Sequence, residues 1–350
     1  MKQNRGLTST KNWKLWVGVL ISALFVYLAL RKVDAARMWM VMASADPFLL
    51  FVAILITLFQ YVIRAWRWAI LVEPIKSTSF TNRLYAILIG FAANCLLPAR
   101  LGEFIRANYL GQTENMSSSS SFGTIVVERL FDGFTLLLIL LIGLIGTTFP
   151  VDWRSLSSSL RGTGFFLLFL YVFLIVFLVG FKYNAKRFLS LLDRLLFLVP
   201  HQFRSKIINV IWNFSLGLVL VKNPSSWVLA IFYSCLLWFS CLCQIQLVEH
   251  AIGLTLPTIA PFMIMAMASF GVMIPSAPGF IGTFHLSVQY GFLLYGVTKE
   301  EALSAAILWH GAFFFPTILL GFISFLILQI SFASLSADPS TSKQERVLDP

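Results

Sequence analysis

Long apolar segments alternate with short polar connections along most of the chain. A helix needs roughly 20 apolar residues to cross the hydrocarbon core of a bilayer, and six segments approach or exceed that length. They are Trp13–Leu30, Pro47–Val72, Ser120–Phe149, Gly164–Phe181, Ser225–Val248 and Ala302–Ile330. The pattern predicts that each forms a membrane-spanning helix, so the expected fold class is an all-α polytopic membrane protein.

Two further apolar stretches, residues 84–110 and 259–297, are interrupted by residues that break helices. Proline removes a backbone donor and glycine relaxes the backbone, so each stretch predicts a half-helix, an irregular turn and a second half-helix. The breakers are Pro98 and Gly102 in the first stretch, and Pro275, Pro278, Gly279 and Gly282 in the second. With the six spans, this gives about eight membrane helices, including two broken re-entrant hairpins.

The two interrupted stretches resemble each other. The proline and glycine of Leu97–Gly102 align with those of Ile274–Gly279, and about 178 residues separate Asp132 from His310 in a second pair of similar motifs. With a cytoplasmic N-terminus, the first hairpin enters from the cytoplasmic side and the second from the outer side. We therefore expect an inverted repeat, as in many transporters. Its halves are residues 47–149 and 225–330.

The remaining segments fit the cytoplasmic side of this topology. Residues 182–222 are basic and carry amphipathic patches, which is typical of helices lying in the membrane interface. Residues 1–12 precede a first span without a signal-peptide cleavage pattern, so we expect that span to be retained. A single transmembrane domain then covers 13–331, and residues 332–350 form a polar tail. Both termini are expected in the cytoplasm, as the positive-inside rule favours.

Composition supports this class and excludes others. Of 350 residues, 12% are charged and 58% hydrophobic, which leaves too few charges to cover a water-soluble surface. The net charge of +11 arises mostly in the short connections, where anionic lipid headgroups explain it, so nucleic acid is not an expected partner. The four cysteines show neither metal-binding nor disulfide spacing. We expect no metal and no cofactor.

Charged residues inside the apolar segments are the candidate functional residues, because each is costly unless it is paired or hydrated. Arg64 and Arg67 lie on one helix face, about two turns from the cytoplasmic end. One interpretation is that both side chains snorkel to the cytoplasmic headgroups. The other is that they clamp a lipid phosphate.

The turn of the first hairpin carries a second group of candidates. They are Asn94, Pro98, Arg100, Gly102, Glu103 and Arg106. Arg100 lies in the turn, whereas Glu103 and Arg106 are one helical turn apart and can form an ion pair. A half-helix that starts near Gly102 would present free backbone N–H groups to an anion. An ion pair that merely closes the loop is the alternative.

A third group, Glu128, Arg129 and Asp132, lies in the span that starts at Ser120. Glu128 and Asp132 share a helix face at i, i+4. Two carboxylates there can couple to a cation or a proton, or they can pair with arginines of neighbouring helices. Salt bridges that hold the bundle together and direct contacts with a substrate are equally valid interpretations.

The turn of the second hairpin, Pro275–Gly282, exposes backbone groups at membrane depth, where they must be buried or line a wet cavity. His285 and His310 lie in or near this region. Each is either a hydrogen-bonded structural residue or part of a substrate site. The prolines and glycines of both turns are the expected gates, namely Pro98, Gly102, Pro275, Pro278, Gly279 and Gly282.

These motifs resemble the transmembrane domain of the lysylphosphatidylglycerol synthase and flippase family. The resemblance rests on Asn94–Glu103 with Arg106, on Glu128–Asp132 and on Ile274–Gly282, and it covers residues 13–330. It implies a membrane domain of about eight helices, a flippase-like role and a bacterial or archaeal plasma membrane. No soluble synthase domain follows the last span, so we do not expect lysyl transfer from tRNA.

Together these features favour a non-enzymatic transporter that moves an anionic phospholipid or lipid-linked precursor between leaflets. The arginines expected at the headgroup are Arg64, Arg67, Arg100, Arg106 and Arg129. One alternative is a membrane-embedded enzyme acting on a lipid phosphate or sugar donor, with Glu128, Asp132 or His285 as acid or base. Another is a non-transporting membrane partner of a separate synthase.

Overall fold

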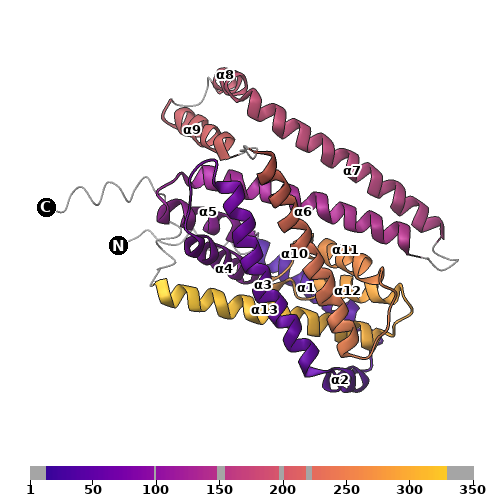
Figure 1. The fold of residues 1–350 in the computed structure, drawn as a ribbon. Helices are drawn as coiled ribbons and strands as arrows, with labels where there is room; N and C mark the ends of the chain where they lie inside the picture. Colours follow the sequence, from indigo (N-terminus) through magenta and orange to yellow (C-terminus); the bar gives the residue numbers. More distant parts are fainter. Residues whose placement is uncertain (1–12, 98–99, 148–153, 197–200, 218–222, 329–350) are drawn as a thin grey trace, which may run out of the picture.

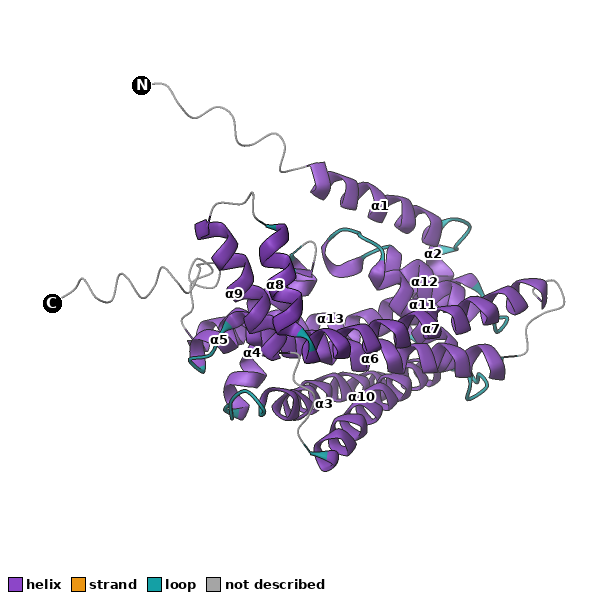
Figure 2. Ribbon diagram, turned by 90° about the horizontal axis from the view of Figure 1, so that it is seen from above, coloured by secondary structure: helices purple, strands orange, loops and turns teal. Residues whose placement is uncertain are grey.

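The computed structural model describes residues 13–97, 100–147, 154–196, 201–217 and 223–328. All regular secondary structure in these ranges is helical, which confirms the all-α class (Figure 1, Figure 2). Within them, three helices are long and apolar enough to cross a membrane. They are α3 (Pro47–Val72), α10 (Pro224–Ala251) and α13 (Lys299–Leu328). Shorter apolar helical segments accompany them, as expected of a polytopic membrane protein.

The helices follow the predicted spans, with shifts at some ends. α1 (Trp13–Leu30) begins and ends as predicted. α6 (Ser118–Gly146) and α7 (Arg154–Tyr183) begin earlier, α7 by about three turns, because polar residues can extend a helix beyond the apolar core. The short helix α2 (Ala35–Ala43) was not predicted. Asp34 caps it by accepting hydrogen bonds from two backbone N–H groups.

Both interrupted stretches form helical hairpins. α4 (Phe80–Leu96) is followed by α5 (Gly102–Thr113), and α11 (Ala260–Met273) is followed by α12 (Thr283–Leu293). A short 3-10 turn lies between α11 and α12. Pro98 lies outside the described residues. The predicted order of helix, irregular turn and helix is therefore confirmed, and the depth of each turn in a bilayer stays a prediction.

The linker predicted at 182–222 contains two short helices at the edge of the molecule. α8 (Ala185–Leu195) and α9 (His201–Gly217) pack together, and α7 runs along the outer side of α6 (Figure 1). On α8 the buried residues are Ala185 and Leu189, and the exposed residues include Lys186 and Arg187. α8 is therefore amphipathic, as its sequence pattern indicates.

The helices of the two halves pack in matching pairs. α3, α4, α5 and α6 correspond to α10, α11, α12 and α13, and each hairpin packs on the long helix that follows it. α3 and α10 run antiparallel, because the N–H of Asp46 before α3 donates to the carbonyl of Ala251 at the end of α10, at 2.8 Å. This is the inverted arrangement expected from the sequence.

The close approach inside each hairpin gives the register of the repeat. A Cβ on Gly90 would lie 2.9 Å from the carbonyl of Gly102, and a Cβ on Gly271 would lie 2.6 Å from the carbonyl of Thr283. Gly90 and Gly271 are 181 residues apart, and so are Gly102 and Thr283. The predicted offset of about 178 is therefore wrong by about one helical turn. The sequence alignment used the turn motifs, and the second turn is longer than the first.

Buried apolar residues form one main cluster in each half. The first is built on α3, α4 and α5 around Trp68, Ile87 and Leu110, and the second on α10 to α13 around Ile264 and Trp309. Each cluster is therefore assembled mostly within one half.

Candidate functional site

An ion-pair network lies where α3, α5 and α6 meet. Arg67 of α3 is fully buried and binds Asp132 of α6 through two hydrogen bonds of 2.6 and 3.2 Å. The same guanidinium lies 3.1 Å from a carboxylate oxygen of Glu128. A planar guanidinium engaged by two carboxylates is held in place, so Arg67 is not free to bind a lipid phosphate.

Glu128 is the centre of this network. It is fully buried and accepts hydrogen bonds from Arg106 at 2.7 and 3.1 Å and from Arg129 at 3.0 Å, in addition to its contact with Arg67. A buried carboxylate needs such partners because it has lost its hydration. Glu128 and Asp132 do share one face of α6, and both are bound to arginines.

Arg129 connects the network to the surface. Its side chain is 38% exposed, and its guanidinium lies 3.2 Å from Asp132 and 3.7 Å from Glu103. We refer to the six side chains together as the charge network. Its members are Arg67, Arg106, Arg129, Glu103, Glu128 and Asp132. Three positive and three negative groups give it no formal net charge.

The ion pair between Glu103 and Arg106 that helical spacing allows does not form. Arg106 binds Glu128 and stacks over the ring of Trp68 at 3.8 Å, whereas Glu103 faces Arg129. The reason is tertiary. α6 brings a fully buried carboxylate to Arg106, and a buried pair interacts more strongly than a partly exposed i, i+3 pair.

The first turn of α5 is occupied by a side chain of its own hairpin. The N–H of Gly102 donates to Oδ1 of Asn94 at 2.8 Å, and Nδ2 of Asn94 donates to Glu103 at 3.4 Å. The N–H group at Gly102 is therefore capped rather than open to an anion. A Cβ at Gly102 would overlap the carbonyl of Gly90, so glycine is required for α4 and α5 to approach this closely.

Two of the five candidate arginines lie outside the charge network. Arg64 stacks over Phe91 at 4.6 Å, and Arg100 donates a hydrogen bond to the carbonyl of Val272 at 2.9 Å. Among the described residues, neither forms an ion pair with a carboxylate. The expected clamp of Arg64 and Arg67 is therefore wrong as a pair, because Arg67 is neutralised and Arg64 is not.

Arg100 joins the two hairpins. It lies in the turn after α4 with a positive φ of 53°, and its guanidinium is 6.0 Å from the ring of Phe280 in the second turn. Val272, which accepts its hydrogen bond, also belongs to the second hairpin. Leu101 and Phe104 beside it are 42% and 57% exposed. A cation and apolar side chains thus share one accessible surface between the hairpins.

The second turn has an unusual backbone and is covered by α1. Gly279 and Gly282 have φ values of 80° and 93°, and Phe280 between them has 56°. A Cβ on Gly282 would lie 2.6 Å from the carbonyl of Ser22 on α1. The hydroxyl of Ser22 accepts a hydrogen bond from the N–H of Ala277 at 2.9 Å. Pro275 and Pro278 flank Ala277 in this turn.

His285 and His310 contact each other rather than the charge network. Their ring nitrogens are 3.2 Å apart, and aromatic side chains surround them. In the register of 181, His310 is the counterpart of Arg129. The second half therefore places a histidine pair in an aromatic cluster where the first half places its ion pairs.

Three contacts of the charge network were not predicted. Ser234 and Trp238 of α10 lie one turn apart, and they bond to Arg67 at 3.2 Å and to Asp132 at 3.3 Å. Trp68 lies under Arg106. The sequence feature that could have predicted the contacts of Ser234 and Trp238 is their spacing of four residues in an apolar span. The same spacing is also typical of residues that only pack against a neighbouring helix.

Over the part of the chain that the structure describes, no group of three or more His, Cys, Asp or Glu side chains could hold a metal ion. The carboxylates of the charge network bind arginines instead. The arrangement can therefore fix guanidinium groups at defined positions inside a membrane protein. Of the five candidate arginines, Arg64 and Arg100 are the two that no carboxylate binds among the described residues.

Comparison with known proteins gives matches over most of the chain. The family described as lysylphosphatidylglycerol synthase TM region matches residues 15–321. A UPF0104 membrane protein of Methanocaldococcus jannaschii is 22% identical, over 89% of this chain and 94% of its own length. Another from Pyrococcus horikoshii is 25% identical, over 88% and 96%. Glycosyltransferase AglD of Haloferax volcanii is 27% identical over 36% of this chain and 20% of its own length.

Proposed function

Because this chain belongs to the lysylphosphatidylglycerol synthase TM region family, we propose that it moves an anionic phospholipid or lipid-linked precursor between the leaflets of the plasma membrane. The observation that carries the proposal is that Arg64 and Arg100 have no carboxylate partner among the described residues, beside a charge network that is neutral in itself.

An unpaired cation inside an apolar segment is unfavourable unless something else supplies the negative charge. A phosphate group is a suitable partner, because a guanidinium binds it through two parallel hydrogen bonds. The charge network contributes indirectly. Since Glu128 and Asp132 are bound to Arg67, Arg106 and Arg129, they do not compete for Arg64 or Arg100.

The surroundings of Arg100 suit an amphipathic ligand. Exposed apolar side chains at Leu96, Leu101 and Phe104 flank the turn that carries this cation. A lipid has the same combination of an anionic headgroup and an apolar chain. The headgroup would contact Arg100 while the acyl chains stay against the apolar side chains, so the ligand need not leave the apolar phase.

The alternative of a membrane-embedded enzyme needs a carboxylate or histidine that is free to act as acid or base. Glu128 and Asp132 are each bound to two or more arginines, which disfavours that role. The partial match to a protein named as a glycosyltransferase favours the other alternative, a membrane partner that serves a separate synthase. Both alternatives give distinct results in the same experiment.

The experiment measures exchange of fluorescent phosphatidylglycerol across proteoliposomes that contain the full chain. We expect exchange in wild type and a loss of about tenfold or more in Arg64→Ala and in Arg100→Ala, because each removes one charged hydrogen-bonding partner. Arg37→Ala on α2 is the matched control, since it removes an exposed cation on another helix.

Three results would contradict the proposal. Equal exchange in Arg64→Ala, Arg100→Ala and Arg37→Ala would show that the unpaired arginines do not bind the headgroup. Conversion of an added lipid without exchange would favour the enzyme. Absence of both, with co-purification of a soluble transferase, would favour the partner.

A further inference from the structure

The histidine pair of the second half has a hydrogen-bonding pattern that determines where its protons lie. The backbone N–H of Gly282 points to Nδ1 of His285 at 3.3 Å. An N–H can only donate, so this Nδ1 accepts, and the proton of the neutral ring is on Nε2. That Nε2 lies 3.2 Å from Nδ1 of His310. It donates to His310, whose own proton is then also on Nε2.

The chain of donors ends inside the protein. His310 is 6% exposed, and its Nε2 makes no regular hydrogen bond among the described residues. The rings of Phe284, Phe313 and Phe314 surround His310. Both imidazoles are therefore neutral in this arrangement, and neither has a spare acceptor.

A proton added to this chain must break a hydrogen bond. The lone pairs that could take it are Nδ1 of His285 and Nδ1 of His310, and both are already in use. Protonation at Nδ1 of His285 would set an N–H against the N–H of Gly282. Protonation at Nδ1 of His310 would set two N–H groups against each other. In either case two donors face each other and must separate.

The bond to Gly282 is one of several contacts that hold the second turn. His285 is the third residue of α12, so its contact with Gly282 caps that helix. The residues before it have the positive φ values of Gly279, Phe280 and Gly282, which persist only when surrounding contacts hold them. The hydroxyl of Thr283 also holds this turn, since it donates to Ser276 at 3.2 Å and lies 3.3 Å from the carbonyl of Phe280. Ser22 of α1 contacts the turn at Ala277, and Arg100 lies over Phe280.

The elements packed against the pair carry other ionisable groups. They are Tyr27 on α1, Arg37 on α2, Tyr61, Arg64 and Arg67 on α3, Arg83, Tyr85 and Cys95 on α4, Tyr233, three cysteines, Glu249 and His250 on α10, Tyr290 on α12, and Lys299, Glu300 and Glu301 on α13. Glu300 and Glu301 bind Asp34 and Thr298 at 3.0 and 2.7 Å. His285 is in direct contact with His310, and Arg100 is the cation over the turn.

We propose that His285 and His310 form a proton-binding site that holds the second hairpin closed when neutral and releases it when one proton is bound. The proton comes from the aqueous phase, adds to an Nδ1 lone pair and leaves when the hairpin closes. The further step, that a proton gradient drives lipid movement through this site, rests on the proposed function.

The first test observes the rings. The chain has four histidines, so ¹⁵N-histidine NMR of the full chain in nanodiscs can resolve each ring. We expect the pair to be neutral with Nε2–H at the upper end and to take up one proton between about pH 6 and pH 3, because burial disfavours the charged imidazolium. His285→Asn keeps an acceptor for Gly282 but cannot be protonated, and His250→Asn on α10 is the matched control. Rings that stay neutral throughout this range would overturn the proposal.

The second test observes the turns. Spin labels at Leu101→Cys and Met273→Cys, which are 42% and 64% exposed, report the separation of the hairpins in a chain whose native cysteines are replaced. On acidification we expect the open population to rise by up to about tenfold, as for loss of one hydrogen bond. The rise should be absent in His285→Asn and in His310→Gln and present in His250→Asn. An equal rise in His285→Asn would overturn the proposal.

Lipid exchange measured over the same pH range separates this inference from the proposed function. Exchange that accelerates on acidification in wild type but not in His285→Asn supports both. Exchange that is independent of pH supports the proposed function and overturns proton coupling. A protonated pair and opened hairpins without exchange at any pH would support the proton site and contradict lipid transport.

Discussion

Glu128 shows how a single buried residue can determine the charges of its neighbours. It contacts three arginines from three positions on α3, α5 and α6. Without it, these cations would face one another in a region of low dielectric constant, where their repulsion is poorly screened. The positions of the three arginines in the charge network thus depend on one carboxylate.

We therefore expect Glu128→Gln to lower the free energy of unfolding by about 3–5 kcal/mol, because it leaves buried cations uncompensated. Denaturant titration of the purified protein measures this. The matched control is Asp193→Asn, which removes the pair with Arg204 at 2.9 Å, where the side chains are 42% and 28% exposed. The control should cost less than about 1 kcal/mol. Equal losses of unfolding free energy in Glu128→Gln and Asp193→Asn would mean that the charge network does not hold α3, α5 and α6 together.

Arg64 and Arg67 show how neighbouring residues of one type can differ in role. The sequence places both on one face of α3, and only the position of α6 decides that Arg67 meets Asp132 and Glu128. Arg64 instead stacks over the ring of Phe91. No pattern within α3 distinguishes the two, because the difference comes from carboxylates that are more than 60 residues away in sequence.

Among the helices, the first hairpin depends on one close contact. At Gly102, α5 starts so near to α4 that any side chain would overlap the carbonyl of Gly90 and the side chain of Asn94. The same contact lets Asn94 reach the N–H of Gly102. The position of Arg100 in the adjoining turn follows from this geometry.

We expect Gly102→Ala to destabilise the protein by about 1–3 kcal/mol or more, because an added methyl group forces the two half-helices apart. Thermal unfolding monitored by size-exclusion chromatography checks this. Gly180→Ala on α7 is the control, since no atom lies within 4 Å of its added Cβ. In an ordinary helix this change is neutral or stabilising by about 0.5–1 kcal/mol. A Gly102→Ala protein with the thermal stability of wild type would contradict the close packing of α4 and α5.

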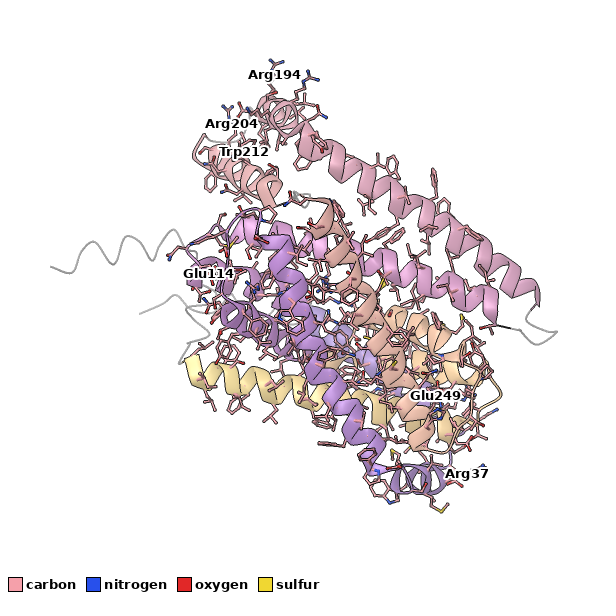
Figure 3. All side chains as sticks on the ribbon, viewed as in Figure 1. Arg37, Glu114, Arg194, Arg204, Trp212 and Glu249 are labelled. Atoms are coloured by element: carbon pink, nitrogen blue, oxygen red, sulfur yellow. The ribbon has the colours of Figure 1, made fainter. Side chains whose placement is uncertain are left out.

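The whole molecule has two polar ends. Figure 3 shows Arg37 and Glu249 together at the lower right and Arg194 and Arg204 at the opposite, upper end. Between them lie the long apolar helices α3, α10 and α13. The predicted topology assigns the end with Arg37 to the outer face and the end with Arg194 to the cytoplasm.

A membrane-impermeant maleimide tests that assignment in intact cells. We expect Arg37→Cys to react without permeabilisation and Arg194→Cys to react only after it. The reason is that the predicted topology places an odd number of membrane spans between the two residues. Both residues are exposed, so the substitutions should leave the fold intact. The protein without an added cysteine is the control for the four native thiols. Reaction of both sites from one side would contradict the topology.

The helical class, most helix positions and both broken hairpins could be predicted from the amino-acid sequence. These features follow from local rules, since apolar length predicts a span and proline with glycine ends a helix. The same rules placed Glu128 and Asp132 on one face of α6. They could not give the length of the second turn, and the predicted register of the repeat was wrong for that reason.

Which charged side chains meet depends on how the helices pack together. Arg106 binds Glu128 rather than Glu103, Asn94 caps Gly102, and Arg100 reaches across to Val272. Each of these contacts joins residues on different segments, and its energy depends on burial that no single helix creates. Whether an arginine inside a membrane is neutralised or available for a ligand is therefore a property of the assembled helices.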